Sequence, residues 1–364
     1  MAATDSHLRF ALALHQGVGA GGGDSCFSPY SVASALTLGL RAARGETADQ
    51  LGELLGEDQA DLLKAATELP AATGAELPEI GVSNTLWAWD ELPLEDSFKT
   101  ELAGWPGASI ESAPFQSDPE AARSLINADV REATHGLIPE LLPAGSVDED
   151  TVAALVNALY LKASWNHPFP EQNTGDLWFK APSGKRKVPA MSQQERMGYA
   201  RRDGWQIVQL GAAGGVCATI LLPDATRDLG QAEALLDAPA LAELLDEVHF
   251  AQVRLTLPKV SLDVQSPLKA LLQNLGVRRL FTSDAELGGI SSDPRLYVQD
   301  VLHQAVLKLD EKGLEGAAAT AMTFALMSAS ISEPVVVEVD RPFLLLVRHP
   351  GTGAVYFFAR VVEP

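Results

Sequence analysis

The sequence is poor in positive charge and in cysteine, and it has no long apolar run. Among its 364 residues, Lys and Arg together number 27 and Asp and Glu number 48, so the formal net charge is −21. A chain this anionic repels nucleic acid and anionic lipid. No stretch of apolar residues is long enough to cross a bilayer. Nucleic-acid and membrane partners are therefore not expected.

The two cysteines, Cys26 and Cys217, have no Cys or His at the spacing of a metal site. No metal and no cofactor are expected. A disulfide between the two is left open, but two buried free thiols are favoured. The N-terminal stretch "MAATDSHLRFALALHQ" lacks the basic start and apolar core of a signal peptide and predicts an amphipathic helix. The compartment is not determined: a cytoplasmic location is the default, and an extracellular one stays open if the N-terminus was trimmed.

Constellations of catalytic residues are missing as well. A Ser–His–Asp set could be assembled from Ser28 or Ser31 with His303 and Asp300, but no Gly-x-Ser-x-Gly nucleophile elbow occurs. A single histidine in an apolar strand is usually a hydrogen-bonded core residue. The glycine cluster Gly17–Gly22 follows a helical pattern rather than a strand, so it lacks the context of a dinucleotide site. A hydrolase is therefore only a remote alternative.

The sequence does contain a helical pattern in its first half and strand patterns in the rest. Ser28 before Pro29, and Asp118 before Pro119, are helix starts in which a capping side chain precedes a first-turn proline. Thr47 is expected to cap a further helix. Strands are predicted for the runs "IGVSNTLWAW", "TVAALVNALYLKASW", "GWQIVQL", "VCATILLP" and "HFAQVRLTLPKV". Helices followed by strands, without a repeat or a linker, predict an α+β fold.

A small basic run, Gly184–Lys187, stands out in this acidic chain. Its position between strand-like runs predicts that it decorates a hairpin turn. Binding of an anionic partner is the lesser alternative.

One segment fits neither pattern. Residues 310–330 read "DEKGLEGAAATAMTFALMSAS", a run rich in Ala, Gly and Thr without a turn signal of its own. In a strand, Leu314 and Gly316 would share one face, and Glu315 and Ala317 the other. Small side chains anchor neither a strand nor a loop firmly. Composition alone slightly favours an Ala-rich helix or linker.

The stretch "DEKGLEGAAATAMT" resembles the hinge of a serpin reactive-centre loop, and further segments resemble the same family in the expected order. Phe27–Leu51 is similar to the serpin helix B region with its Ser-Pro-x-Ser start, and Val156–Phe179 to a central-sheet strand and its following turn. "VDRPFLLLVRHPGTGAVYFFARVVEP" resembles the C-terminal hairpin. Because the ordered set covers nearly the whole chain, the sequence is identified as a serpin, an inhibitory member of prokaryotic type.

The resemblance implies an α+β serpin fold in a single domain, 1–364, with three β-sheets, eight or nine surrounding helices and an exposed reactive-centre loop at about 311–333. It implies a metastable monomer that is a protease inhibitor and not an enzyme. A target serine protease would cleave the loop, which would then insert as a strand into the central sheet and trap the acyl-enzyme; such insertion is a general case of strand addition and strain release. The alternative in the same fold is a non-inhibitory binding protein or chaperone.

The resemblance also assigns residues to regions. The hinge comprises Glu311, Lys312, Gly313, Leu314, Glu315, Gly316, Ala317, Ala318, Ala319 and Thr320. The shutter beneath the central sheet comprises Ser28, Ser31, Asn157 and His303, and the breach, where insertion starts, contains Trp165. Leu314 and Gly316 depart from the family pattern, since small residues and alanine are usual there. Both are uncharged, so inhibition stays the favoured interpretation, and their effect on the rate of insertion is left open.

The family's spacing places the attacked bond at Met327–Ser328, to within one or two residues, with Phe324 and Leu326 nearby. A large apolar residue at this bond suits the hydrophobic primary pocket of a chymotrypsin-like protease. Elastase-like and subtilisin-like targets stay open.

Overall fold

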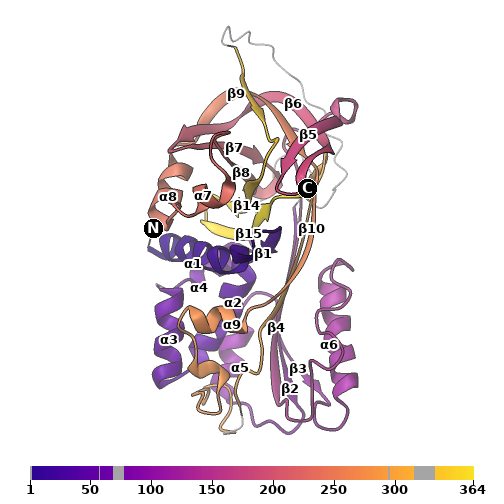
Figure 1. Cartoon of the computed structure of the whole chain (residues 1–364). Coiled ribbons are helices and arrows are strands. Elements are labelled where there is room, and N and C mark those ends of the chain that lie inside the picture. The colour runs from indigo at the N-terminus through magenta and orange to yellow at the C-terminus, as the bar shows by residue number, and fades with distance from the viewer. Residues whose placement is uncertain (1, 57, 69–77, 294–295, 315–332) are drawn as a thin grey trace.

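The structure is a computed structural model in which residues 2–56, 58–68, 78–293, 296–314 and 333–364 are described (Figure 1). The helices of these ranges are α1 (Ala2–Val18), α2 (Pro29–Ala42), α3 (Gly45–Leu55), α4 (Ala60–Ala65), α5 (Asp96–Ala103), α6 (Pro119–Ala133), α7 (Leu229–Glu233), α8 (Ala238–Asp246) and α9 (Lys269–Asn274). None of the helices in this part of the chain combines the length and the apolar character needed to cross a bilayer.

One sheet has six strands, and it holds the candidate site. In spatial order they are β10 (Val260–Pro267), β11 (Leu302–Leu309), β12 (Gly313–Leu314), β4 (Ala153–Ser164), β2 (Glu79–Trp89) and β3 (Ala108–Ala113). Neighbouring strands pair antiparallel except β2 and β3, which are parallel. Helix α6 lies along one face of this sheet (Figure 1), where Ile126 and Val130 pack in a buried cluster with Trp87, Val156 and Ala158.

The second sheet has nine strands. Eight follow the order β1 (Ser25–Phe27), β15 (Ala354–Val361), β14 (Phe343–His349), β8 (Cys217–Pro223), β7 (Trp205–Gly211), β6 (Gly184–Arg202), β9 (His249–Pro258) and β13 (Val335–Glu338), and β5 (Gly175–Ala181) pairs with β6. The long strand β6 pairs with β7 near its end and with β5 near its start. It therefore joins two strand groups, and with the six-stranded sheet they make three. The α+β class predicted from the sequence is confirmed.

Helix α2 packs between the two sheets and begins as its sequence predicts. The Ser28 side chain accepts a hydrogen bond from the Ser31 N–H (3.1 Å), and Pro29 occupies the first turn. Tyr30 and Leu38 of this helix are fully buried. The prediction for Thr47 is wrong, because α3 begins two residues earlier and the buried Thr47 hydroxyl accepts instead from the Glu286 N–H (3.0 Å). The start of α2 thus follows from contacts between neighbouring residues, whereas the Thr47 hydroxyl bonds to a segment far away in the sequence.

Both cysteines, Cys26 and Cys217, are free and buried, as favoured from the sequence. The basic run Gly184–Lys187 begins β6 at the turn of the β5–β6 hairpin, as expected.

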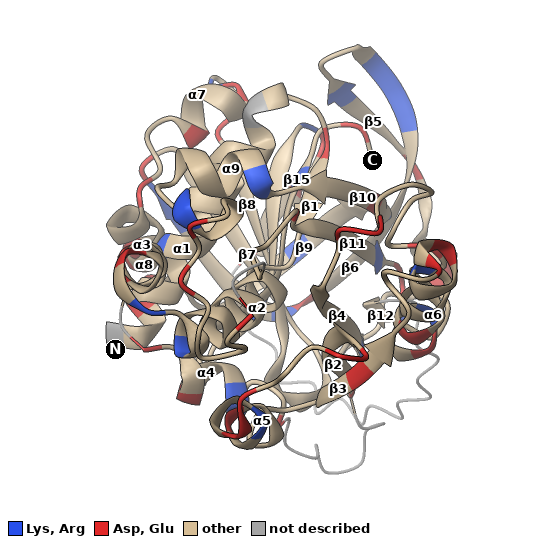
Figure 2. Cartoon of the chain, turned by 90° about the horizontal axis from the view of Figure 1, so that it is seen from below, with Lys and Arg blue, Asp and Glu red and all other residues tan. Residues whose placement is uncertain are grey.

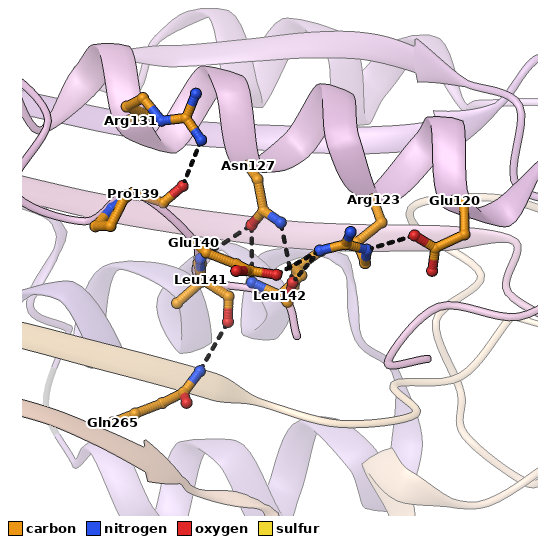
Figure 3. A network of polar contacts seen from close by, with 9 residues as sticks. All are labelled: Glu120, Arg123, Asn127, Arg131, Pro139, Glu140, Leu141, Leu142 and Gln265. Carbon is orange, nitrogen blue, oxygen red and sulfur yellow. Dashed lines mark hydrogen bonds and ion pairs between the residues drawn. The ribbon is translucent and has the colours of Figure 1, made fainter. Parts of the chain in front are cut away.

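Side-chain hydrogen bonds hold the segment after α6 against that helix (Figure 3). Asn127 Oδ1 accepts from the N–H groups of Leu141 (2.9 Å) and Leu142 (2.8 Å), and its Nδ2 donates to the Leu142 carbonyl (2.9 Å). Arg123 donates to the same carbonyl (2.9 Å). From the sheet, Gln265 of β10 donates to the Leu141 carbonyl (2.8 Å). The segment is therefore tied both to α6 and to an edge strand of the six-stranded sheet.

Replacing Asn127 with alanine should lower the free energy of unfolding by about 2–4 kcal/mol, because two N–H groups would be left without a partner at a buried position. The matched control is Arg131→Ala, which removes one exposed hydrogen bond to the Pro139 carbonyl and should cost no more than about 0.5 kcal/mol. Urea denaturation of both variants measures the difference. Equal losses would show that the Asn127 carboxamide does not hold the segment.

Candidate functional site

The middle of the six-stranded sheet is filled by a strand of only two residues. Gly313 and Leu314 of β12 pair with Ser164 and Ala163 of β4, and Leu314 also pairs with Leu309 of β11. Strand β4 has 12 residues, so most of its length has no partner on this side among the described residues. The facing edges of β4 and β11 below β12 are called the slot. Such unpaired edges are templates for the addition of a strand.

The Leu314 side chain fills the upper end of the slot. It is only 1% exposed. With Leu159 and Leu161 of β4 and Val306 of β11, it lines a small cavity of about 10 Å³ that Leu137 also contacts. The remaining lining residues are Tyr160, Leu307, Lys308 and Phe357, so the cavity offers no carboxylate to a cationic side chain at position 314.

The chain reaches β12 through a tight turn held by Trp165. The indole Nε1 donates to the Asp310 carbonyl (2.8 Å), and the Trp165 N–H donates to the Lys312 carbonyl (2.9 Å). A Cβ at Gly313 would lie 2.3 Å from the Ala163 carbonyl oxygen, so this close approach requires glycine. Trp165 therefore lies where the hinge enters the sheet; its role as the breach residue stays a prediction.

Glu311 ties the hinge to three other segments. Its carboxylate accepts from the Thr174 hydroxyl (2.7 Å) and pairs with Lys259 (2.9 Å), while its carbonyl accepts from the Phe169 N–H (2.9 Å). Burial raises the pKa of the Glu311 carboxyl, but the hydrogen bonds from Lys259 and Thr174 outweigh burial and hold the pKa below its usual value. The carboxylate is therefore ionised at neutral pH and fixes the start of the hinge.

The predicted shutter residues surround a larger cavity of about 180 Å³ farther along the slot, which Ser31, Asn157 and His303 line. The Ser28 N–H donates to Nε2 of His303 (2.9 Å), and Ser31 bonds to Ser28, so this chain of contacts joins α2 to β11. Asn157 instead donates to Oδ1 of Asn84 in the neighbouring strand β2 (2.6 Å). Hydrogen bonds thus join Ser28, Ser31 and His303 to one another, and Asn157 lines the same cavity without bonding to them.

Burial lowers the pKa of His303 to about 4. Because Nε2 accepts the hydrogen bond from Ser28, the neutral ring carries its proton on Nδ1. His303 is therefore a neutral structural link at physiological pH, and its surroundings supply no activated nucleophile.

Three residues of the site were not anticipated: Asn84, Thr174 and Lys259. An asparagine within an apolar strand run is a signal that could have indicated Asn84. Thr174 and Glu311 are 137 residues apart in the sequence, and no local sequence pattern predicts a contact between them.

The other predicted site residues lie outside the described ranges. They are Glu315, Gly316, Ala317, Ala318, Ala319, Thr320, Phe324, Leu326, Met327 and Ser328. Within the described ranges, no three His, Cys, Asp or Glu side chains are grouped as metal ligands.

Comparison with known proteins assigns the whole arrangement to one family. A family model described as "Serpin (serine protease inhibitor)" matches residues 5–364. Serpin-ZXA of Oryza sativa subsp. japonica is 34% identical over 99% of this chain and 96% of that protein. The leukocyte elastase inhibitor of Bos taurus is 32% identical over 94% of this chain and 93% of that protein. The chain belongs to the serpin family.

Solved structures agree on the fold. Uncleaved ovalbumin superposes with a TM-score of 0.89 at 23% identity and covers 100% of both chains. The thermophilic serpin tengpin, in its native state, superposes with a TM-score of 0.86 at 23% identity over 99% of this chain and 94% of that one. At this identity the likeness concerns the fold alone.

Acidification should weaken the native state partly through His303. The folded pKa of about 4 lies below the ordinary value of 6.5, so the unfolded chain takes up the proton first. The stability contributed by the neutral ring is complete above pH 6.5 and is lost as pH falls toward 4, by roughly 3 kcal/mol in all.

His303→Gln is the matched comparison, since glutamine can still accept from the Ser28 N–H but does not titrate. The variant should lose less unfolding free energy than the wild type between pH 6.5 and 4 in urea denaturation series, with the buried His7 contributing equally to both. Parallel pH profiles would contradict the assignment.

Proposed function

We propose that the protein is a covalent inhibitor of serine proteases that inserts its hinge into the slot after cleavage at Met327–Ser328. The observation that carries the proposal is the slot itself, whose two facing strand edges already hold Gly313 and Leu314. The coarser conclusion, serpin-type protease inhibition, is supported by relatives named as protease inhibitors, such as the leukocyte elastase inhibitor.

Insertion is favoured by backbone chemistry. A strand of roughly ten residues would gain backbone hydrogen bonds worth about 1 kcal/mol each. That sum is comparable with the whole free energy of unfolding of a domain, about 5–15 kcal/mol. Residues 315–320 carry small side chains apart from Glu315, and the segment 311–331 contains no proline. These features suit entry into an apolar slot.

Met327 at the cleaved bond favours a chymotrypsin-like target. A trypsin-like protease requires Arg or Lys, and neither occurs between Gly313 and Val339. An elastase-like protease is the second candidate, given Ala325 and Ala329 and the name of the bovine relative. A non-inhibitory binding role is disfavoured because the predicted hinge lacks the prolines and inward charges that block insertion. The protein is proposed to act as a monomer formed by one domain, 1–364.

Incubation with chymotrypsin should give an adduct that survives boiling in detergent, and the released C-terminal peptide should begin at Ser328 or within two residues of it. Leu314→Arg should be cut at the same bond but form little adduct. Because Leu314 is already buried before cleavage, the arginine should withdraw β12 from the slot, and insertion would then have to begin by burying the guanidinium. That burial costs at least several kcal/mol, which outweighs the first few strand hydrogen bonds. Gel electrophoresis measures the ratio of adduct to cleaved product.

Glu315→Arg is the matched control, because strand alternation predicts the opposite face for the next residue. It should retain most of the inhibition. Reversible inhibition that leaves the chain intact would overturn the proposed mechanism, and equal behaviour of the two arginine variants would overturn the assignment of faces.

A further inference from the structure

The β5–β6 hairpin carries a local excess of positive charge on an acidic molecule. Trp178 pairs with Lys187 and Lys180 with Lys185 across the two strands, so these four side chains share one face. From 175 to 190 the chain carries four basic residues, Lys180, Lys185, Arg186 and Lys187, against Asp176 alone, or 4 − 1 = +3, in a chain of net charge −21. Figure 2 shows this hairpin projecting from the body with blue on both strands.

Trp178 is the centre of this face. It is 52% exposed, although the next residue, Phe179, is fully buried on the other face. The Nζ atoms of Lys185 and Lys187 lie 5.2 Å and 5.6 Å from the centre of its ring. The Lys187–Asp176 ion pair is more than half exposed on both sides and contributes little, so both partners can exchange it for another contact. A large exposed aromatic residue rimmed by charge marks an interaction surface.

The hairpin is also bonded to both flanks of the segment 315–332. Thr174, directly before β5, donates to Glu311 on one flank (2.7 Å). Lys180 in β5 donates its N–H to the Asp340 carbonyl (2.7 Å) and pairs with the Asp340 carboxylate (2.6 Å) on the other flank. Strand β5 and the residue before it are therefore tied to the chain on both sides of the segment that the proposed target protease would bind.

We infer that the face formed by Trp178, Lys180, Lys185 and Lys187, called the hairpin patch, binds an acidic surface of the target protease. The inference rests on the proposed function and adds a criterion of target choice beyond the residue at the cleaved bond. At physiological ionic strength the Debye length is about 8 Å, so an approaching protease responds to the hairpin patch more than to the distant carboxylates. Charges placed this way act mainly on the rate of encounter.

A nucleic acid or another polyanion is the less suitable partner. Such a ligand extends over many charges and would meet the acidic remainder of the molecule, whereas the hairpin patch offers only three lysines. A protease bound at the segment 315–332 needs only one complementary surface beside it.

The test uses full-length protein and two forms of chymotrypsin, untreated and with its surface lysines succinylated to make it acidic. The variant Lys185→Gln/Lys187→Gln removes two charges from the hairpin patch. The control Arg41→Gln/Lys99→Gln removes two exposed charges from α2 and α5, away from the hairpin (Figure 1). With the succinylated enzyme at low salt, the patch variant should react about three- to tenfold more slowly than the wild type. The control should match the wild type, and high salt should abolish the difference.

Two readouts separate this inference from the proposed function. The rate of cleavage between residues 315 and 332 reports the encounter, and the fraction of adduct reports trapping. Absence of adduct from all proteins would overturn the proposed function, while the cleavage rates would still test the patch. Equal cleavage rates of wild type and patch variant with the acidic enzyme would overturn the inference. So would loss of retention on heparin-agarose in the patch variant with unchanged protease rates, since the patch would then bind polyanions.

Discussion

The facing edges of β4 and β11, which have no strand partner below β12 among the described residues, are the constraint on which the rest of the structure depends. Folded proteins usually cover or pair such edges, because unpaired backbone groups attract any strand within reach. Among the described residues, only Gly313 and Leu314 pair between these two edges. The other features of the site keep the slot open and apolar: α6 and its following segment lie over it, the Ser28–His303 bond joins α2 to β11, and Glu311 secures the incoming chain.

This arrangement means that the free energy available from strand addition would be released at the slot. A gap in a central sheet leaves backbone hydrogen bonds unmade that only an added strand can supply. Leu314 is already buried at the entrance, so further insertion would extend an existing strand and would not have to begin a new one. The residues that line the slot need no catalytic chemistry, which agrees with the neutral, buried His303.

Much of the fold could be predicted because its signals are local. Ser28 and Asp118 accept from backbone N–H groups at helix starts, as short-range capping rules require. The features that could not be predicted depend on contacts between residues far apart in the sequence or on a close steric fit. Thr47 was predicted as a cap, but a distant backbone N–H recruits its hydroxyl. The two-residue strand β12 depends on the fit of Gly313 against the Ala163 carbonyl, a contact that no periodicity reveals. The predicted cleavage bond lies outside the described residues and stays a prediction.

The most direct measurement is the thermal unfolding midpoint before and after clean cleavage within residues 321–328 by a protease that is not trapped. An ordinary protein becomes less stable when it is nicked, because the unfolded chain gains conformational freedom. If the freed hinge fills the slot as an added strand, the cleaved protein should instead unfold at a higher temperature than the intact one. An unchanged or lower midpoint would contradict the account.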